Sequence, residues 1–359
     1  MEFLTDYGLF LAKTLTLVFA FLFLVLIIAA NASRHRHEGK HRGNIVVSKI
    51  NDELEDLKDD IRHEILEHDV LKAEAKAEKK LKKEEEKARK KAAASGENGE
   101  AERKRIYVLD FDGDVKASEV EDLRQTITAV LTLARPELDE VMLRLESPGG
   151  MVHAYGLAAS QLTRLRRHGI PLTICVDRVA ASGGYMMACV ASQLIAAPFA
   201  YIGSIGVLVQ LPNLHRLLKD NKVDYEMITA GEYKRTLTTF GENTERGRAK
   251  VQEEVDEMHS LFKDFIHENR PGMDLAPVAT GEVWTGTQAL QKGLIDAIDT
   301  SDEWITGKCQ DADVYRVEWE EKKPLRDRLS SLLEGSLSNI MNNTLLRWLH
   351  RADKEKFYS

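Results

Sequence analysis

Cysteine is scarce in this chain of 359 residues, which holds only Cys175, Cys189 and Cys309. Their number is odd, and two of them lie in apolar runs, where a reduced thiol packs as a small hydrophobic group. This pattern excludes a disulfide framework, and we expect no metal site, no cofactor and no cysteine nucleophile. A phosphate-cradling glycine loop with its lysine is also missing, so no nucleotide site is predicted.

The chain also lacks an excess of positive charge. Its formal net charge is -8, and no basic stripe interleaved with aromatic residues occurs in the body of the sequence. We therefore expect no nucleic acid as a partner. With 43% hydrophobic residues, the chain is long enough for one large or two modest domains with real cores.

A long apolar run stands near the N-terminus, where Leu15–Ala30 has Thr16 as its one polar residue. A helix over residues 9–30 measures roughly 33 Å, enough to cross a bilayer core. A cleaved signal peptide is the alternative to a membrane-spanning helix, because Ala30-Asn31-Ala32 is similar to a signal-peptide cleavage site. The acidic residues Glu2 and Asp6 and the length of the run favour an uncleaved transmembrane anchor over residues 9–30.

Residues 31–104 form a basic flank followed by a charged stalk or linker. The apolar residues near its start keep 4-3-4-4 spacing, which predicts an amphipathic helix with a narrow seam formed by Ile50, Leu54, Leu57, Ile61 and Ile65. A solvated stalk and a partner-binding coiled coil both fit this composition. The small residues of Ser95–Gly99 mark where the stalk ends and a folded domain begins.

From residue 105 to 320 strand and helix patterns alternate, which predicts an α/β domain with a mainly parallel sheet and flanking helices. The predicted strands are Ile106–Phe111, Glu140–Leu145, Pro171–Val176, Leu194–Ala197 and Tyr225–Thr229. The predicted helices are Ser118–Ala134, Ala154–His168, Gly184–Ser192, Leu214–Asn221 and Thr244–Glu268. The uncharged stretch Val179–Leu214 is interrupted by glycines and a proline, so it belongs to a globular core rather than to a second membrane span.

Ser182 is the strongest candidate for a catalytic group. It follows a short apolar run and stands at the head of a small-residue helix, in the sequence Ala181-Ser182-Gly183-Gly184-Tyr185. A serine on such a turn offers a nucleophilic hydroxyl, and the N–H groups after it are free to receive an oxyanion. The alternative is that Ser182 only caps the helix.

A second glycine turn, Ser147-Pro148-Gly149-Gly150, follows the second predicted strand. In isolation this sequence is typical of a plain turn. Two such turns at the carboxyl ends of parallel strands meet at one edge of a sheet, where α/β proteins bind ligands. Together they predict an oxyanion hole with one N–H from Gly149 or Gly150 and one from Gly183.

The base for Ser182 is harder to identify, because the histidines are poorly placed for a Ser-His-Asp triad. Lys234 follows a predicted strand and leads into a polar loop. A lysine acts as a base only when neutral, which requires burial to lower the lysine pKa from about 10.4. By residue type alone, Lys234 fits an ordinary solvated lysine better.

Five ordered motifs resemble the signal peptide peptidase A family of serine proteases, and the anchor and stalk look closest to its SohB branch. They are Ser147–Gly150, Ala181–Tyr185, Gly203–Val207, Gly231–Lys234 and Trp284–Asp296. The resemblance implies a ClpP/crotonase-like fold and a Ser-Lys dyad. Ser182 matches the nucleophile and Lys234 the general base, Ser204 matches a serine that orients the lysine, and Gly183, Gly149 and Gly150 match the oxyanion hole.

The resemblance also implies a peptide or protein substrate and a homo-oligomer, in which Ser182 of one chain faces Lys234 of the next. It favours a single-pass protein of the bacterial inner membrane with its catalytic domain in the periplasm. The basic flank after Ala30 favours the cytoplasmic side instead, by the positive-inside rule. We predict a periplasmic catalytic domain, with the cytoplasmic side as the alternative.

The C-terminal part, residues 321–359, is predicted to be an amphipathic helical tail. It packs on the body or a neighbour, or it docks on the membrane surface. Two other functions stay open for the whole chain. One is a crotonase-like acyl-CoA enzyme that needs neither Ser182 nor Lys234, and the other is a catalytically inactive membrane scaffold.

Overall fold

The structure is a computed structural model that describes residues 13, 14, 16, 43–66 and 103–321. Most of the predicted anchor, residues 67–102 of the stalk and residues 322–359 of the tail lie outside this part of the chain. Ile45–Trp319 form one compact unit. Within the described ranges, no helix combines the length and the apolar character needed to cross a bilayer.

The described elements alternate as predicted for an α/β domain. The strands are β1 (Gly43–Lys49), β2 (Arg105–Asp112), β3 (Glu140–Glu146), β4 (Leu172–Val176), β5 (Val179–Ala181), β6 (Gln193–Ala196), β7 (Tyr201–Gly203), β8 (Val283–Thr285), β9 (Ala297–Ile298) and β10 (Asp313–Glu321). The helices are α2 (Ile50–Ile65), α4 (Val120–Leu131), α5 (Val152–Arg167), α6 (Gly183–Ala188), α7 (His215–Asp220), α8 (Glu245–Asn269), α9 (Gly286–Gln291) and α10 (Ser301–Lys308).

The main sheet has the order β1-β10-β2-β3-β4-β6-β9 in the described part of the chain. Pairing is parallel from β10 through β2, β3, β4 and β6 to β9. A smaller sheet has the order β5-β7-β8, with β8 antiparallel to β7. The mainly parallel α/β sheet that we predicted is therefore confirmed, and it fits a ClpP-like fold.

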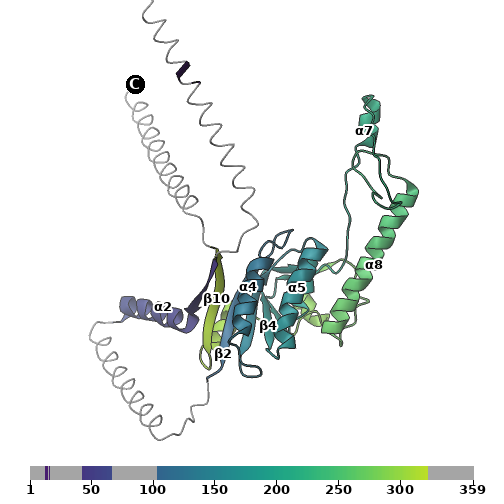
Figure 1. Ribbon diagram of the computed structural model, residues 1–359. Helices are drawn as coiled ribbons and strands as arrows, with labels where there is room; N and C mark the ends of the chain where they lie inside the picture. Colours follow the sequence, from purple (N-terminus) through teal and green to yellow (C-terminus); the bar gives the residue numbers. More distant parts are fainter. Residues whose placement is uncertain (1–12, 15, 17–42, 67–102, 322–359) are drawn as a thin grey trace, which may run out of the picture. The chain divides into compact units, whose positions relative to one another are not determined.

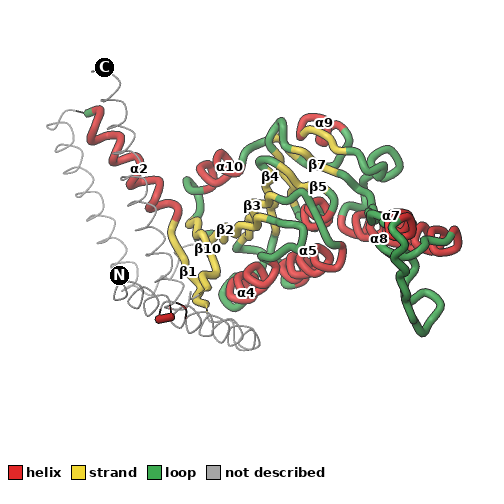
Figure 2. Tube along the Cα trace, turned by 90° about the horizontal axis from the view of Figure 1, so that it is seen from above, coloured by secondary structure: helices red, strands yellow, loops and turns green. Residues whose placement is uncertain are grey.

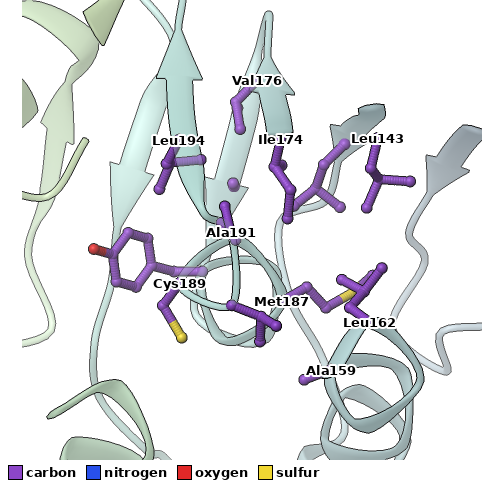
Figure 3. Packing of buried hydrophobic residues seen from close by; sticks show 14 of the residues in the cluster. Leu143, Ala159, Leu162, Ile174, Val176, Met187, Cys189, Ala191 and Leu194 are labelled. Atoms are coloured by element: carbon purple, nitrogen blue, oxygen red, sulfur yellow. The ribbon is translucent and has the colours of Figure 1, made fainter. Parts of the chain in front are cut away.

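The two faces of the sheet bury different side chains because neighbouring strand residues point to opposite sides. Helices α4 and α5 cover one face (Figure 1), and α10 lies over the other (Figure 2). The larger core contains Leu109 and Leu143 from the strands, whereas Val108 and Met142 belong to the smaller core with Trp304 of α10. Figure 3 shows the larger core, where α5 and the segment around α6 meet strand residues such as Ile174 and Leu194.

Four of the predicted strands are confirmed as β2, β3, β4 and β6, and the five predicted helices correspond to α4, α5, α6, α7 and α8. The predicted strand Tyr225–Thr229 is wrong, because this segment has no strand beside it and stays in an irregular conformation. Its alternating bulky residues favour a strand, but a strand needs a hydrogen-bonding partner. Ile228 in its middle is 97% exposed.

The first described segment of the predicted flank and stalk, residues 43–54, packs onto the domain. The main sheet includes β1, and Asn51 at the start of α2 donates to the carbonyls of Cys309 and Ala312, both at 3.0 Å. Ile50 is buried, but Leu57, Ile61 and Ile65 of the predicted seam are exposed. The amphipathic helix is confirmed, and its first turn is part of the core.

Candidate active site

Ser182 lies between β5 and α6 in a backbone conformation that residues other than glycine rarely adopt, with φ 53° and ψ -117°. Such a conformation costs about 1–3 kcal/mol and persists where the surroundings enforce it. Here the Ser182 N–H donates to the Gly203 carbonyl at 2.8 Å, and the Ser182 carbonyl accepts from the Met186 N–H at 3.0 Å. The turn is held from both sides.

The Ser182 side chain makes no capping hydrogen bond to α6, so the interpretation of this residue as a simple helix cap is wrong. The residue is half-buried, with the fully buried Gly184 and Tyr185 shortly after it. A strained backbone, a hydroxyl that does not cap and a helix start together are typical of a nucleophile.

The two predicted glycine turns are in contact. Gly149 has φ +89°, and a Cβ atom placed on it would lie 2.8 Å from Ser182 Cβ and 2.7 Å from the Gly183 nitrogen. Ser147 bridges to Ala180 of β5, which draws the turns together. Only glycine fits at position 149, both for its φ and for this close approach.

Two N–H groups at this junction make no hydrogen bond with the described residues, those of Gly150 and of Gly183, the first residue of α6. The Gly149 N–H instead donates to Ser147 Oγ at 3.1 Å. Of the two alternatives for the second oxyanion donor, the structure therefore favours Gly150. Gly150 is exposed and Gly183 is buried.

Ser204 lies beside this group, at the end of β7. Its neighbour Gly203 accepts the Ser182 N–H, and its own N–H donates to the Glu282 carbonyl at 2.7 Å. Ser204 is half-buried and has φ 51°. The structure thus brings together Ser182, Gly183, Gly149 and Ser204 of the predicted site.

Lys234 is not brought to Ser182 within one chain. It is exposed in the segment between α7 and α8, and its ammonium group has no hydrogen bond or ion pair with any described residue. The adjacent Tyr233 ring lies under Lys250 in the first turns of α8, 5.6 Å from the Lys250 Nζ. The part of α8 that enters the core begins at Phe262, roughly 18 Å further along the helix at 1.5 Å per residue.

Lys234 belongs to an arm, residues 207–244, that projects beyond the parallel sheet together with the start of α8 (Figures 1 and 2). The arm carries exposed apolar side chains, among them Leu208, Val209, Leu217, Tyr225, Ile228 and Phe240. A concentration of exposed apolar side chains on one segment is a common feature of interaction sites. Tyr225 and Phe240 pack partly against each other, with ring centroids 5.9 Å apart, whereas Ile228 and Leu208 are 97% and 79% exposed.

The cysteines are packing residues. Cys175 and Cys189 are buried, and burial raises the pKa of each thiol to about 12. A thiol that stays protonated is neither a nucleophile nor a metal ligand. The prediction that they pack as small hydrophobic groups is confirmed, since Cys189 belongs to the larger core and Cys175 to the smaller one.

Sequence reasoning missed two side chains at the junction of the turns. The Ser147 Oγ and Tyr155 Oη atoms lie 2.5 Å apart, and both residues are fully buried. In the sequence, Ser147 is typical of a turn residue, and nothing distinguishes Tyr155 from the other residues of its predicted helix. A tyrosine in the first turn of the helix that follows the glycine pair is the one signal that points to it.

Comparison with known proteins identifies the family. Residues 2–162 match the family model described as Peptidase family S49 N-terminal, and residues 164–315 match Peptidase family S49. The chain is 54% identical to "Probable protease SohB" of Haemophilus influenzae over 248 residues, which cover 69% of this chain and 70% of that protein. The chain belongs to peptidase family S49. The predicted resemblance is thereby confirmed.

Other S49 relatives agree. "Probable protease SohB" of Buchnera aphidicola is 51% identical over 239 residues, covering 67% of this chain and 71% of that protein. "Protease 4" of Haemophilus influenzae is 26% identical over 263 residues, covering 68% of this chain but 42% of that longer protein. Membership of S49 and these relatives support a peptidase that acts on peptides or proteins.

Proposed function

We propose that this S49 peptidase is a membrane-anchored serine endopeptidase that hydrolyses peptides or membrane-associated protein fragments with a Ser-Lys dyad. The observation that carries the proposal is Ser182, held with a positive φ against Gly149 and followed by an N–H without a partner at Gly183. This arrangement combines a nucleophile with an oxyanion site. A crotonase-like acyl-CoA enzyme would need the N–H groups but no strained serine.

In the proposed reaction, neutral Lys234 accepts the Ser182 proton while Ser182 Oγ attacks the peptide carbonyl carbon. The carbonyl oxygen becomes an oxyanion, and the N–H groups of Gly183 and of the Gly149-Gly150 turn stabilise it. The protonated lysine then gives its proton to the leaving amine, which yields the acyl-enzyme. A water deprotonated by the same lysine hydrolyses the ester and restores Ser182.

The dyad in this proposal is shared between two copies of the chain. Lys234 is exposed on the arm, and its neighbour Tyr233 packs beside Lys250, which precedes the buried Phe262 by roughly 18 Å along α8. In this proposal a neighbouring chain therefore supplies the lysine to each Ser182. Burial between two chains would also remove Lys234 from water, which favours the neutral amine that a base requires. The exposed apolar side chains of the arm would be covered by the same contact.

The remaining parts of the proposal concern the membrane. Residues 9–30 anchor the chain in the inner membrane as a single span, and the catalytic domain lies in the periplasm. The apolar run Leu15–Ala30 supports the anchor. A reporter enzyme fused after Ser359 tests on which side of the membrane the catalytic domain lies. A reporter that works only in the periplasm should be active in this fusion, whereas activity of a reporter that works only in the cytoplasm would reverse the assignment.

A complementation experiment tests the shared dyad. Full-length Ser182→Ala and Lys234→Ala variants should each lose peptidase turnover by at least about 10⁴-fold while remaining folded, since each removes a group that acts in the chemical step. Mixed under conditions that exchange subunits, the two variants should regain activity, because some sites combine an intact Ser182 with an intact Lys234.

The outcomes separate the parts of the proposal. Full turnover by either purified variant would contradict the Ser-Lys dyad. Inactive single variants that recover nothing on mixing, although labelled subunits demonstrably exchange, would contradict the shared site. Labelling of wild-type Ser182 by a fluorophosphonate distinguishes the peptidase from an acyl-CoA enzyme, which would leave this serine unlabelled.

A further inference from the structure

A buried hydroxyl network lies directly beneath the glycine turn that follows β3. The Gly149 N–H donates to Ser147 Oγ at 3.1 Å, and Ser147 Oγ lies 2.5 Å from Tyr155 Oη. Tyr155 Oη donates its one hydrogen to the Asp114 carbonyl at 2.7 Å. The Ser147 hydroxyl must therefore donate to Tyr155. Four groups form a chain with one direction, from the Gly149 N–H through Ser147 and Tyr155 to the Asp114 carbonyl.

The same two side chains touch the second turn. A Cβ atom on Gly183 would lie 2.4 Å from Cγ of the Tyr155 ring, so the ring packs against the Gly183 backbone. A Cβ atom on Gly184 would lie 2.5 Å from the Ser147 carbonyl oxygen. That carbonyl also accepts the Ala181 N–H at 3.0 Å. Ser147 and Tyr155 thus contact both turns, the one with Gly149 and the one with Gly183.

The choice of residue types argues for a role beyond packing. Burying a hydroxyl costs free energy unless it is hydrogen-bonded, and apolar residues of similar shape would fill the space without that requirement. Here each hydroxyl has a partner, and burial raises the pKa of the Tyr155 phenol, so the phenol keeps the proton it donates. Directed hydrogen bonds fix a backbone position more narrowly than apolar contacts, which lack direction.

We propose that Ser147 and Tyr155 are positioning residues that set the position of the Gly149-Gly150 turn relative to Gly183, and so the separation of the two oxyanion donors. The proposal rests on the proposed peptidase function. Neither residue touches the substrate. Their effect should appear in the transition state, where the oxyanion forms, rather than in the binding of the uncharged substrate.

The test compares Tyr155→Phe with wild type, both as full-length protein in detergent. The variant keeps the ring over Gly183 and removes only the hydroxyl. We expect kcat to fall by about tenfold to a hundredfold with KM nearly unchanged, because small displacements of catalytic groups have effects of this size. Inhibition by a peptide aldehyde, which forms an oxyanion on Ser182, should weaken by a similar factor. Ser147→Ala should behave in the same way.

Tyr185→Phe is the matched control. Tyr185 is also a fully buried tyrosine of this region, and its hydroxyl donates to the Leu294 carbonyl at 2.9 Å, away from the two turns. It should lose thermal stability to a similar extent as Tyr155→Phe but keep the wild-type kcat and aldehyde affinity. This separates positioning from a general loss of stability.

The possible results distinguish failure of the positioning role from failure of the peptidase proposal. The positioning role would be overturned if Tyr155→Phe kept the wild-type kcat, or if Tyr155→Phe and Tyr185→Phe lost kcat equally. In either case, activity of the wild-type enzyme would leave the peptidase proposal intact. A rise in kcat for Ser147→Ala would also overturn it, since Ser147 would then compete for the Gly149 N–H. Failure of the proposed function itself shows differently, as a wild-type protein that neither cleaves peptides nor reacts with a fluorophosphonate.

Discussion

Single atoms decide the geometry around Ser182, because the glycines near it leave no room for a side chain. A methyl group at Gly149 would meet the Ala181 carbonyl oxygen at 2.6 Å, and one at Gly183 would enter the Tyr155 ring. These contacts are shorter than any that packed atoms tolerate, so a side chain at either position must displace a turn. The strained φ of Ser182 persists because its N–H is held by Gly203.

Gly149→Ala should therefore impair both stability and catalysis. The φ of +89° and the close backbone atoms predict a loss of about 2–4 kcal/mol in the free energy of unfolding. The displaced oxyanion turn predicts a fall in kcat/KM of at least about 100-fold. Urea unfolding and peptide hydrolysis measure the two effects.

Gly156→Ala is the control for this substitution. Gly156 lies within α5, and a Cβ atom there would meet nothing within 4 Å. Since alanine is the better helix former, the variant should keep its activity and gain up to about 1 kcal/mol of stability. Equal losses in the two variants would show that the contacts at Gly149 are not what matters.

Among the elements, the loop from α4 to β3 is anchored by a buried carboxylate. Asp139 is completely buried, and its carboxylate accepts the N–H groups of Arg105 at 3.1 Å and Arg135 at 2.9 Å as well as the Arg135 guanidinium. Burial acts to raise the pKa of Asp139, but the hydrogen bonds from Arg135 and Arg105 outweigh it and hold the pKa below its ordinary value of 3.8. The carboxylate joins the start of β2 to this loop.

This lowered pKa predicts how stability depends on pH. A group with a lowered pKa in the folded state contributes fully above its unfolded pKa, and the contribution is lost as pH falls through the folded value. Asp139→Asn should lose about 3 kcal/mol at pH 7, since it breaks a buried ion pair. Between pH 7 and pH 3, urea unfolding should show a smaller decline for this variant than for wild type.

Asp59→Asn provides the comparison for Asp139. The Asp59 side chain is 55% exposed on α2, beside Arg62 at 3.8 Å. Exposed ion pairs contribute little, so its unfolding free energy should stay within about 0.5 kcal/mol of wild type at every pH. If the stability of Asp139→Asn followed the wild-type pH dependence, the Asp139 carboxylate would not be the group whose titration lowers the wild-type stability.

At the scale of the whole molecule, the proposed self-association concerns the arm. Its exposed apolar side chains lie on a segment that makes no strand pairing, and Lys234 stands among them. A second copy of the chain would cover this surface and complete the dyad at once. The apolar residues and the lysine thereby receive one explanation.

Ile228→Asp should separate the subunits. Ile228 is 97% exposed, so the change should barely affect the fold of one chain, but a charge in a covered contact should weaken self-association by at least about tenfold. Sedimentation velocity in detergent should show smaller species, and peptidase turnover should fall with them. Leu133→Asp, at a site 62% exposed after α4, should leave both unchanged. Dispersed subunits with full turnover would contradict a shared dyad.

The sequence predicted those parts of the fold that depend on residues close together in the chain, and it missed those that depend on pairing between distant segments. Alternating strands and helices are local patterns, so β2, β3, β4 and β6 and the helices between them were predictable. Short strands such as β7 and β8 were not, because they are three residues each and depend on pairing with distant segments, β7 with β5 and β8, and β8 with β7. Tyr225–Thr229 failed for the opposite reason, since it has a strand pattern without a partner.

The sequence by itself determined the family, the parallel α/β domain and the two glycine turns that flank Ser182, because each is written in residues close together in the chain. Only the tertiary structure decided that Gly149 touches Gly183, that Ser147 and Tyr155 share a hydrogen bond, and that Lys234 stands away from Ser182. These facts depend on contacts between distant segments, which form only when the whole sheet has folded.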